Sequence, residues 1–369
     1  MSTTPDQLPQ SVKVERYLCL DDLPEDACQL LDQAELANVE LGRAWFANLV
    51  QTVYPNDTTL RFYLLRHEGR ALALLPLRAE KVGGSLRIKA LSNFYTALYE
   101  PPMVEQLKAQ DLRPLLAAAR ADFPGAASLW ISPMDPQSRA YELLRDACRL
   151  EGWRPFEFFS FGNWFMRIAQ PWDQYYKGRA GEVRNTIKRM SKRLAEAGGT
   201  LQLVTEPQDL PMALAAYEKV YAASWKQPEP FVDFVPGLLK TFAARGWLIL
   251  GLVWIKGEAV AAQIWIVAHG RAEIYKLAYD EQFKQYSPGT LLTAKLMEHV
   301  FRTLPSAEID YLIGDDPYKK AWMTERRERW GLVAYNLRTL AGFKGWLVEW
   351  ATRRVKRAIA AYRKPIVTH

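Results

Sequence analysis

The stretch Arg271–Asp316 constrains the fold most, because it has the pattern of a strand, a small-residue turn, a helix and a second strand. Residues 291–301 carry apolar side chains at helical spacing. Pro288 and Gly289 lie where this helix begins, a position at which proline is tolerated. A turn of this kind presents free backbone N–H groups beside the positive end of the helix dipole. It therefore predicts an anion site, suited to a pyrophosphate, unless its small residues serve the turn alone.

Three apolar runs precede this turn and predict an antiparallel meander. They span residues 247–255, 259–268 and 272–279. Tight glycine-containing turns at Lys256–Glu258 and His269–Arg271 join them, which is the signal of hairpin-connected strands.

The first half of the chain has the same order of elements. A hairpin around His67–Arg70 is followed by a strand at 86–91, a helix at 104–121, a strand at 128–132 and a helix at 137–150. The shared order predicts an α/β (α+β) protein of two similar units in tandem, each a mixed, mostly antiparallel sheet flanked by helices. No residue-level repeat accompanies it.

The repeated order of elements and the basic tail give the predicted domain organisation. We place a first, degenerate domain at 1–170, a second at 171–340 and a basic amphipathic helix at 341–369. Within them we expect one helix over 34–50 and one long basic helix over 172–197, ended by two glycines.

The formal net charge of +7 indicates an anionic partner, namely a phosphorylated cofactor, a nucleic acid or a membrane surface. The excess lies in residues 177–193 and in the tail. The first cluster is either a solvated face or a surface for an anionic acceptor, through Arg184 and Lys188. The tail 342–364 alternates aromatic and aliphatic residues with cations, which suits peripheral contact with an anionic leaflet. The alternative is a helix docked on the body by its apolar face.

Other classes of protein are not indicated. No apolar run approaches the roughly 18 residues of a membrane span, and the start resembles no signal peptide, so we expect a cytoplasmic protein. Cys19, Cys28 and Cys148 are scattered and are expected to be reduced and structural. The histidines form no ligand pair, so no metal is expected. No serine elbow or Cys/His pair indicates covalent catalysis.

Several short motifs lie in a fixed order over residues 172–336. They are Arg184–Arg189, Ser224–Lys226, Val260–Gln263, Tyr275–Asp280, Ser287–Gly289, Asp310, Gly314–Lys319 and Trp322. Their order and spacing resemble the GNAT (Gcn5-related) acyltransferase superfamily. More narrowly, they resemble its BioF2-like or CelD-like acetyltransferase branch, which is related to the FemAB aminoacyltransferases. FemAB proteins similarly contain two GNAT-like units in tandem.

The turn departs from the family pattern in one respect. GNAT enzymes carry a Gln/Arg-x-x-Gly-x-Gly/Ala turn for the coenzyme A pyrophosphate, whereas Gln285–Thr290 displaces the glycine by one place and Pro288 removes one N–H donor. The resemblance implies acetyl-CoA or another acyl-CoA as the acyl donor. Because this turn offers fewer N–H donors than the family's turn, aminoacyl-tRNA remains the alternative donor. The implied donor-binding residues are Leu277, Ala278, Tyr279, Gln285, Ser287, Gly289 and Thr290.

The resemblance also implies direct attack of an amine on the acyl carbonyl, in which positioning and oxyanion stabilisation do most of the work. Tyr318 is then the first candidate for the acid that protonates the leaving group; otherwise it packs at a helix start. Asp315 and Asp316 are candidates to bind or deprotonate the amine, or else they cap the helix ahead of Pro317.

Two lysines are candidates for substrate phosphate. Lys276 has apolar strand neighbours, so it needs an anionic partner, either a substrate phosphate or Asp310 in a salt bridge. Lys319 contacts a phosphate or is a surface lysine.

Three further residues are candidates for the acceptor cleft. Gln263 is a polar residue in an otherwise apolar run. Ser224 and Trp225 are candidates for the acceptor groove, although Trp225 also suits a core position.

The leading hypothesis from the resemblance is an N-acyltransferase. It would move an acyl group from coenzyme A to an amine of a sugar, lipid or cell-envelope polysaccharide precursor, without a DNA partner. The alternatives are a FemAB-type aminoacyltransferase that uses tRNA and a non-catalytic module at the membrane.

Overall fold

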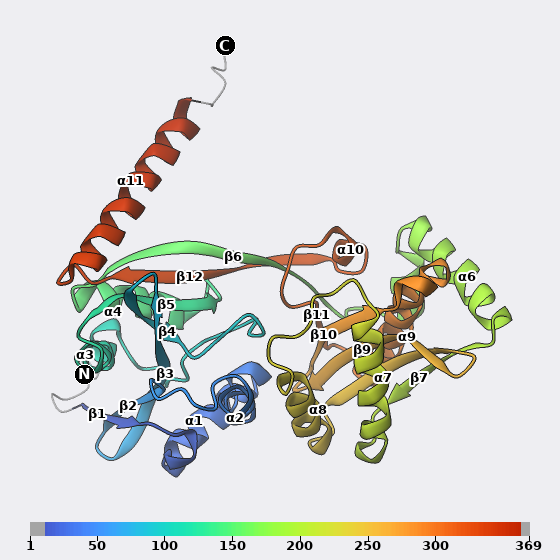
Figure 1. Cartoon of the computed structure of the whole chain (residues 1–369), viewed down its shortest axis with the longest axis horizontal. Helices are drawn as coiled ribbons and strands as arrows, with labels where there is room; N and C mark the ends of the chain where they lie inside the picture. Colours follow the sequence, from blue (N-terminus) through green and yellow to red (C-terminus); the bar gives the residue numbers. More distant parts are fainter. Residues whose placement is uncertain (1–11, 363–369) are drawn as a thin grey trace, which may run out of the picture.

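The structure is a computed structural model that describes residues 12–362. Its strands form one continuous sheet in the order β1-β2-β3-β4-β5-β12-β6-β11-β10-β9-β8-β7 (Figure 1). The strands are β1 (Lys13–Tyr17), β2 (Arg61–His67), β3 (Arg70–Val82), β4 (Ser85–Ala90), β5 (Ala126–Met134), β6 (Arg154–Arg167), β7 (Gly199–Val204), β8 (Leu248–Ile255), β9 (Glu258–Ala268), β10 (Arg271–Tyr279), β11 (Glu308–Asp310) and β12 (Glu325–Tyr335). The α-helices are α1 (Glu25–Glu35), α2 (Arg43–Thr52), α3 (Arg113–Asp122), α4 (Arg139–Leu150), α5 (Trp172–Lys177), α6 (Gly181–Glu196), α7 (Leu210–Ala222), α8 (Phe234–Ala244), α9 (Pro288–Thr303), α10 (Pro317–Lys320) and α11 (Leu340–Tyr362).

The element order repeats, with α5 and α6 between the two series. The first series is β1-α1-α2-β2-β3-β4-α3-β5-α4-β6, and the second is β7-α7-α8-β8-β9-β10-α9-β11-α10-β12. Each series contains one parallel pair at the matching place, β4 with β5 and β10 with β11, whereas its other neighbouring strands pair antiparallel. The predicted mixed α/β fold with two tandem units is confirmed.

The last strand of each series pairs with the other series. β12 pairs antiparallel with β5, and β6 pairs antiparallel with β11. β6 and β12 also pair with each other along most of their length and run between the two halves (Figure 1). The predicted boundary near residue 170 thus falls between β6 and α5 in a sheet that both segments share, and the division into domains stays a prediction.

Tight turns form the meanders as the sequence indicates. Each two-residue turn places both residues at positive φ, as a type I′ hairpin requires. The residues and angles are Glu68 (47°) and Gly69 (78°), Lys256 (51°) and Gly257 (80°), and His269 (50°) and Gly270 (74°). The predicted meander of β8, β9 and β10 is therefore confirmed.

The predicted basic helix over 172–197 is wrong as one element, because it is two helices. Gly178 ends α5, and its N–H donates to the carbonyls of Gln174 and Tyr175. Tyr175 is fully buried, with its ring centroid 4.6 Å from that of Phe301 on α9. Burying this side chain fixes the direction of α5, and the chain turns before α6 begins.

Two other helix predictions have wrong bounds. The helix expected over 34–50 is split between α1 and α2, since Asn38 accepts a bond from the Glu40 N–H and starts a separate turn. The helix expected from 104 begins only at Arg113, because Val104 still donates to the Leu72 carbonyl beside β3.

The terminal helix α11 projects from the body (Figure 1). Its start packs closely on the body, since a side chain at position 342 would meet the Ala127 and Asn336 carbonyls. Farther along, Arg353 donates to the Glu157 carbonyl of β6 at 2.6 Å. Most of its large apolar side chains are exposed, although Trp346 is half-buried, which contradicts docking of the helix by its whole apolar face. The exposed ones are Leu340, Phe343, Leu347, Val348, Trp350, Val355 and Ile359. The cations Arg363 and Lys364 lie outside the described residues. No helix within 12–362 is long and apolar enough to cross a membrane.

A buried carboxylate fixes the junction of the two halves. Asp310 accepts bonds from Arg271 (3.2 Å), Arg327 and Asn163 (2.5 Å), and from the Leu312 N–H (2.7 Å). Burial alone would raise its pKa, but Arg327, Arg271 and these hydrogen bonds lower the pKa of Asp310 below its usual value. The ionised Asp310 therefore joins β6, β10, β11 and β12.

We predict that Asp310→Ala lowers the free energy of unfolding by about 3 kcal/mol, because two partly buried guanidinium groups lose a shared carboxylate. Urea denaturation measures this loss. The control Glu298→Ala removes a surface pair with Arg302 and should cost below about 1 kcal/mol. Equal losses in the two variants would contradict the anchoring role of Asp310.

Candidate functional site

The site begins where β10 separates from β11. The parallel pairing of these strands covers only Arg271–Glu273 with Glu308–Asp310. The register between β9 and β10 shifts between Ile274 and Lys276, so a β-bulge lies at Tyr275. Beyond it, Lys276–Tyr279 pairs with β9 alone among the described residues. One edge of β10 is therefore open beside the segment that follows β11.

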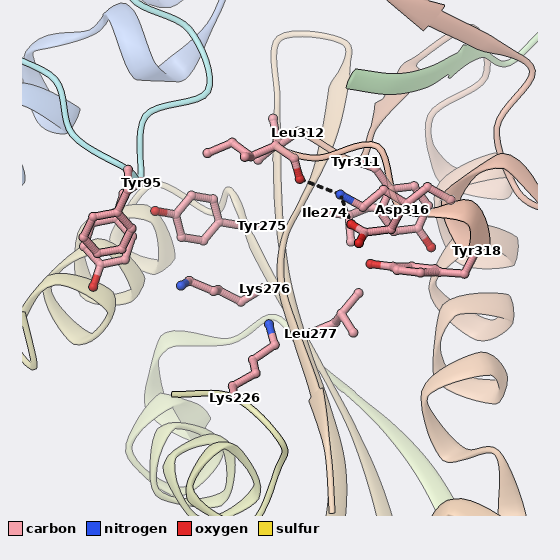
Figure 2. A pocket seen from close by; sticks show the side chains of 13 residues that line it. Tyr95, Lys226, Ile274, Tyr275, Lys276, Leu277, Tyr311, Leu312, Asp316 and Tyr318 are labelled. Atoms are coloured by element: carbon pink, nitrogen blue, oxygen red, sulfur yellow. Dashed lines mark hydrogen bonds and ion pairs between the residues drawn. The ribbon is translucent and has the colours of Figure 1, made fainter. Parts of the chain in front are cut away.

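Two cavities lie along this open edge and share Lys226, Leu277, Asp316 and Tyr318. The large cavity, about 710 Å³, is bounded by β10, the start of α9 and the start of α6. The small cavity, about 260 Å³, is bounded by β10, the segment 311–319 and a loop of the first half (Figure 2). Within residues 12–362 no three His, Cys, Asp or Glu side chains are grouped to hold a metal ion.

The predicted turn lies at the large cavity. Ser287 adopts the left-handed conformation (φ 48°) ahead of α9, and Gly289 and Thr290 in the first turn line the cavity. The first N–H groups of a helix have no intrahelical partner, so these residues present donors to it. A Cβ at position 289 would lie 3.4 Å from the Tyr279 ring, so any larger side chain must occupy the space between them.

Gln263 holds this turn against the sheet. Its side-chain amide donates to the Gly289 carbonyl (3.0 Å) and to the Thr293 hydroxyl (2.7 Å), and its oxygen accepts from the Trp265 ring N–H (3.1 Å). Gln263 is buried but lines the large cavity, as predicted for a polar group in an apolar strand. Ala278, predicted to bind the donor on a strand that offers backbone N–H groups, has its side chain buried in the core.

A basic cleft adjoins the same helix start. Gln285 and Ser287 line it together with Lys284 and cations of α6, which are Arg189, Lys192 and Arg193. The Arg193 guanidinium donates to the Gln285 carbonyl at 3.4 Å. Arg184 and Lys188, the α6 cations predicted to bind substrate, are exposed and do not line the cleft or the cavities. Other cations of α6, namely Arg189, Lys192 and Arg193, face the cleft instead, and binding of an anionic acceptor by this basic run stays a prediction.

Tyr318 lines both cavities, and Figure 2 shows its ring at the small one. It is the second residue of α10, and its ring meets that of Tyr311 edge-on, with centroids 5.8 Å apart. Its side chain remains 46% exposed toward the cavities. Burial and then the Asp316 charge raise the pKa of Tyr318, so the hydroxyl is protonated at neutral pH and able to donate.

The structure separates the two candidate aspartates. Asp316 lines both cavities. Asp315 forms ion pairs with Arg326 (2.7 Å) and accepts from the Trp164 ring N–H (2.6 Å), outside both cavities. The hydrogen bond from Arg326 contributes most to lowering the pKa of Asp315, so this carboxylate is engaged structurally.

Lys319 is buried rather than a surface lysine, which corrects that alternative. Its ammonium donates to the Ile313 carbonyl (2.5 Å) and the Gly314 carbonyl (3.3 Å) and lies 3.3 Å from Asp316. Burial lowers the pKa of Lys319. The residue holds the loop after β11 in place at the edge of the small cavity.

Lys276 pairs with Glu229 (2.6 Å), so the predicted salt bridge with Asp310 is wrong. The pairing of β10 with β11 ends at Glu273, opposite Asp310, and Lys276 lies beyond that end. Glu229 also accepts from the Tyr95 hydroxyl (2.6 Å), and the Lys276 ammonium lies 4.9 Å from the Tyr95 ring centroid. This group joins the loop after α7, β10 and the first half of the chain.

The segment after α7 lines the cavities with different residues from those that the sequence indicated. Trp225 is 47% exposed and packs on Tyr279 (4.7 Å between ring centroids) at the large cavity, so the core alternative is wrong. Ser224 donates to the Tyr221 carbonyl (2.7 Å) and does not line either cavity. Lys226, which sequence analysis did not select as a site residue, lines both.

Comparison with known proteins agrees with this geometry. Residues 181–320, which include α6, β10, α9 and Tyr318, match the family model of the acetyltransferase (GNAT) domain. No curated protein matches the sequence.

Several solved structures share the fold. The C-terminal domain of a putative lysylphosphatidylglycerol synthetase from Agrobacterium fabrum is 15% identical, with a TM-score of 0.50 over 86% of this chain and 93% of that one. FemX is 13% identical, with a TM-score of 0.51 over 75% and 88%. A conserved protein of unknown function from Bacteroides thetaiotaomicron is 11% identical, with a TM-score of 0.57 over 88% and 100%. At these identities the likeness is one of fold.

Proposed function

On the premise that this chain is a GNAT-superfamily protein with a FemAB-related tandem fold, we propose that it is an N-acyltransferase. It moves an acyl group from acyl-CoA to an amine of a sugar, lipid or cell-envelope polysaccharide precursor. The observation that carries the proposal is the open edge of β10 beside the first turn of α9, with a cavity of about 710 Å³ between them.

The site offers contacts for the phosphates and for the thioester arm of the donor. The pyrophosphate would accept from the N–H groups of Gly289 and Thr290 at the positive end of α9. Other phosphate oxygens would meet the cations of the basic cleft. The extended thioester arm would lie along Lys276–Tyr279, where an open strand edge offers backbone hydrogen bonds.

The reaction follows from these positions. The acceptor ammonium loses one proton to solvent or to Asp316, and the free amine attacks the thioester carbonyl carbon. Backbone N–H groups of β10 stabilise the negative oxygen that forms. The C–S bond then breaks and Tyr318 protonates the thiolate. The nitrogen loses its second proton, which returns through solvent to the Tyr318 oxygen. The products are an amide, the coenzyme A thiol and one released proton.

We predict that Tyr318→Phe lowers kcat by about 10² to 10⁴, because a positioned general acid is lost. The KM for acyl-CoA should change little, since the phenyl ring keeps the packing with Tyr311. Thiol release in the steady state measures both constants. Tyr335→Phe, on β12 away from the cavities, is the matched control; an unaltered kcat in Tyr318→Phe would remove this residue from the mechanism.

We predict that Gly289→Trp weakens coenzyme A binding at least about tenfold, because the indole enters the space that the donor needs. Isothermal titration with coenzyme A measures the affinity. Gly289→Ala places only a methyl group 3.4 Å from Tyr279 and should bind nearly as the wild type does. Equal affinity in the wild type and Gly289→Trp would argue against this donor site.

A second candidate donor is aminoacyl-tRNA. It is favoured by Pro288, which removes one N–H from the turn, and by the fold shared with FemX. Binding of charged tRNA with no binding of coenzyme A in the same titration would select this donor. Binding of neither would favour a non-catalytic module.

The proposal includes peripheral contact of α11 with an anionic bilayer. The helix combines exposed apolar side chains, such as Trp350 and Val355, with the cations Lys344, Arg354 and Lys356. Apolar area and cationic charge on one helix are the two contributions that hold a helix at such an interface.

We predict that the protein sediments with phosphatidylglycerol vesicles but not with phosphatidylcholine vesicles, and that salt weakens the association. Deleting 348–369 should abolish sedimentation and leave turnover of a water-soluble amine intact. The described residues of this segment line neither cavity, and they touch the body through Arg353, at the Glu157 carbonyl and the Phe156 ring. The double variant Lys356→Glu/Arg357→Glu keeps the helix and should also fail to sediment. Undiminished sedimentation of the truncated protein would exclude α11 as the contact.

A further inference from the structure

Lys226 places an ammonium group where the two cavities meet. Its Nζ lies 5.8 Å from the Tyr221 ring centroid and 6.0 Å from that of Trp225. Among residues 12–362 no carboxylate comes within ion-pair distance of it. Burial, and then the charge of Lys276, lower the pKa of Lys226 to about 8, so most molecules carry the charge at pH 7.

The other two lysines of the small cavity already have anionic partners. Lys276 pairs with Glu229 at 2.6 Å, and Lys319 lies 3.3 Å from Asp316 and donates to two carbonyls. Figure 2 shows the ends of Lys226 and Lys276 near each other, between Tyr95 and Tyr318. The cavity therefore holds one positive charge more than its own residues compensate, and that charge is at Lys226.

The first half of the chain forms one wall of the small cavity. Phe94 and Tyr95 lie in the connection between β4 and α3 and line the cavity opposite residues 311–319. The Tyr95 ring stacks on Phe234 with centroids 4.0 Å apart, and its hydroxyl donates to Glu229. Phe94 remains exposed beside it. The second half alone would leave this cavity without a wall, so the first half takes part in the site.

We propose that the small cavity binds the acceptor of the acyl transfer, and that this acceptor carries an anionic group, a phosphate or a carboxylate, held by Lys226. The inference rests on the proposed function and names its substrate class. A partly buried ammonium group without a counter-ion is costly, and an anionic ligand removes that cost. The acceptor amine then lies toward Tyr318 and Leu277, two of the four residues that both cavities share.

Matched amines test the substrate class. Phosphoethanolamine and β-alanine carry a phosphate and a carboxylate near the amine, and ethanolamine carries neither. With acetyl-CoA as donor we expect kcat/KM for at least one anionic amine to exceed that for ethanolamine at least about tenfold. The preferred anion separates a phosphate acceptor from a carboxylate acceptor. Equal values for all three amines would overturn the proposal.

Variants of Lys226 test the assigned residue. In Lys226→Met the ratio of anionic to neutral kcat/KM should fall toward one, and Lys226→Arg should restore most of it, because a cation returns. Lys240→Met, an exposed lysine on α8, is the matched control and should keep the wild-type ratio. An unchanged ratio in Lys226→Met would overturn the assignment.

A binding measurement separates this inference from the proposed reaction. Titration with phosphoethanolamine and with β-alanine, without any donor, should show affinity for at least one of them that drops at least about tenfold in Lys226→Met. That result would support the small cavity as the binding site of an anionic acceptor. If acyl-CoA turnover were absent at the same time, only the proposed reaction would fail. No binding of either compound by the wild type, or equal binding by the variant, would overturn the inference while turnover could still stand.

The same titration has an expected pH dependence. Affinity should fall as the pH rises through about 8, where the Lys226 ammonium loses its proton. The other charged groups that face Lys226 are Lys276, Glu229, Lys319 and Asp316. The fall should be absent in Lys226→Met, and its persistence there would assign the effect to one of those groups and contradict the proposal.

Discussion

The short parallel pairing between β10 and β11 is the constraint on which the site depends. Asp310 ends that pairing and is held by Arg271, Arg327 and Asn163. Because a buried carboxylate with several donors has one favourable position, the chain after β11 leaves the sheet at a fixed point. On β10 the pairing ends at Glu273, just ahead of the bulge at Tyr275. The cavities fill the wedge between the two strands.

Local signals allowed the part of the site on the second half to be predicted. Glycine-containing turns defined the ends of β8, β9 and β10, and Pro288 marked the start of α9, because each of these depends on backbone preferences of a few adjacent residues. Gln263 was recognisable as a polar residue in an apolar strand, whereas Tyr318 was selected from the resemblance to GNAT enzymes. Gln263 lines the large cavity, and Tyr318 lines both cavities.

The parts that were missed arise from contacts between distant segments. β12 begins with the charged run Glu325–Arg329, which lacks a strand pattern, yet it pairs along β6. Lys226, Glu229 and Tyr95 have no shared motif and meet only when the two halves assemble. The exposure of Trp225 likewise depends on a cavity beneath it, which composition does not indicate.

The exchange of β6 and β12 has a consequence for synthesis of the chain. While the ribosome is still adding the second series of elements, the edge of β5 has no partner, because β12 is among the last strands to emerge. An unpaired edge invites pairing with another chain. The sheet of the nascent first half therefore stays incomplete until β12 is synthesised. The chain then completes both of its units in one late folding step rather than one after the other.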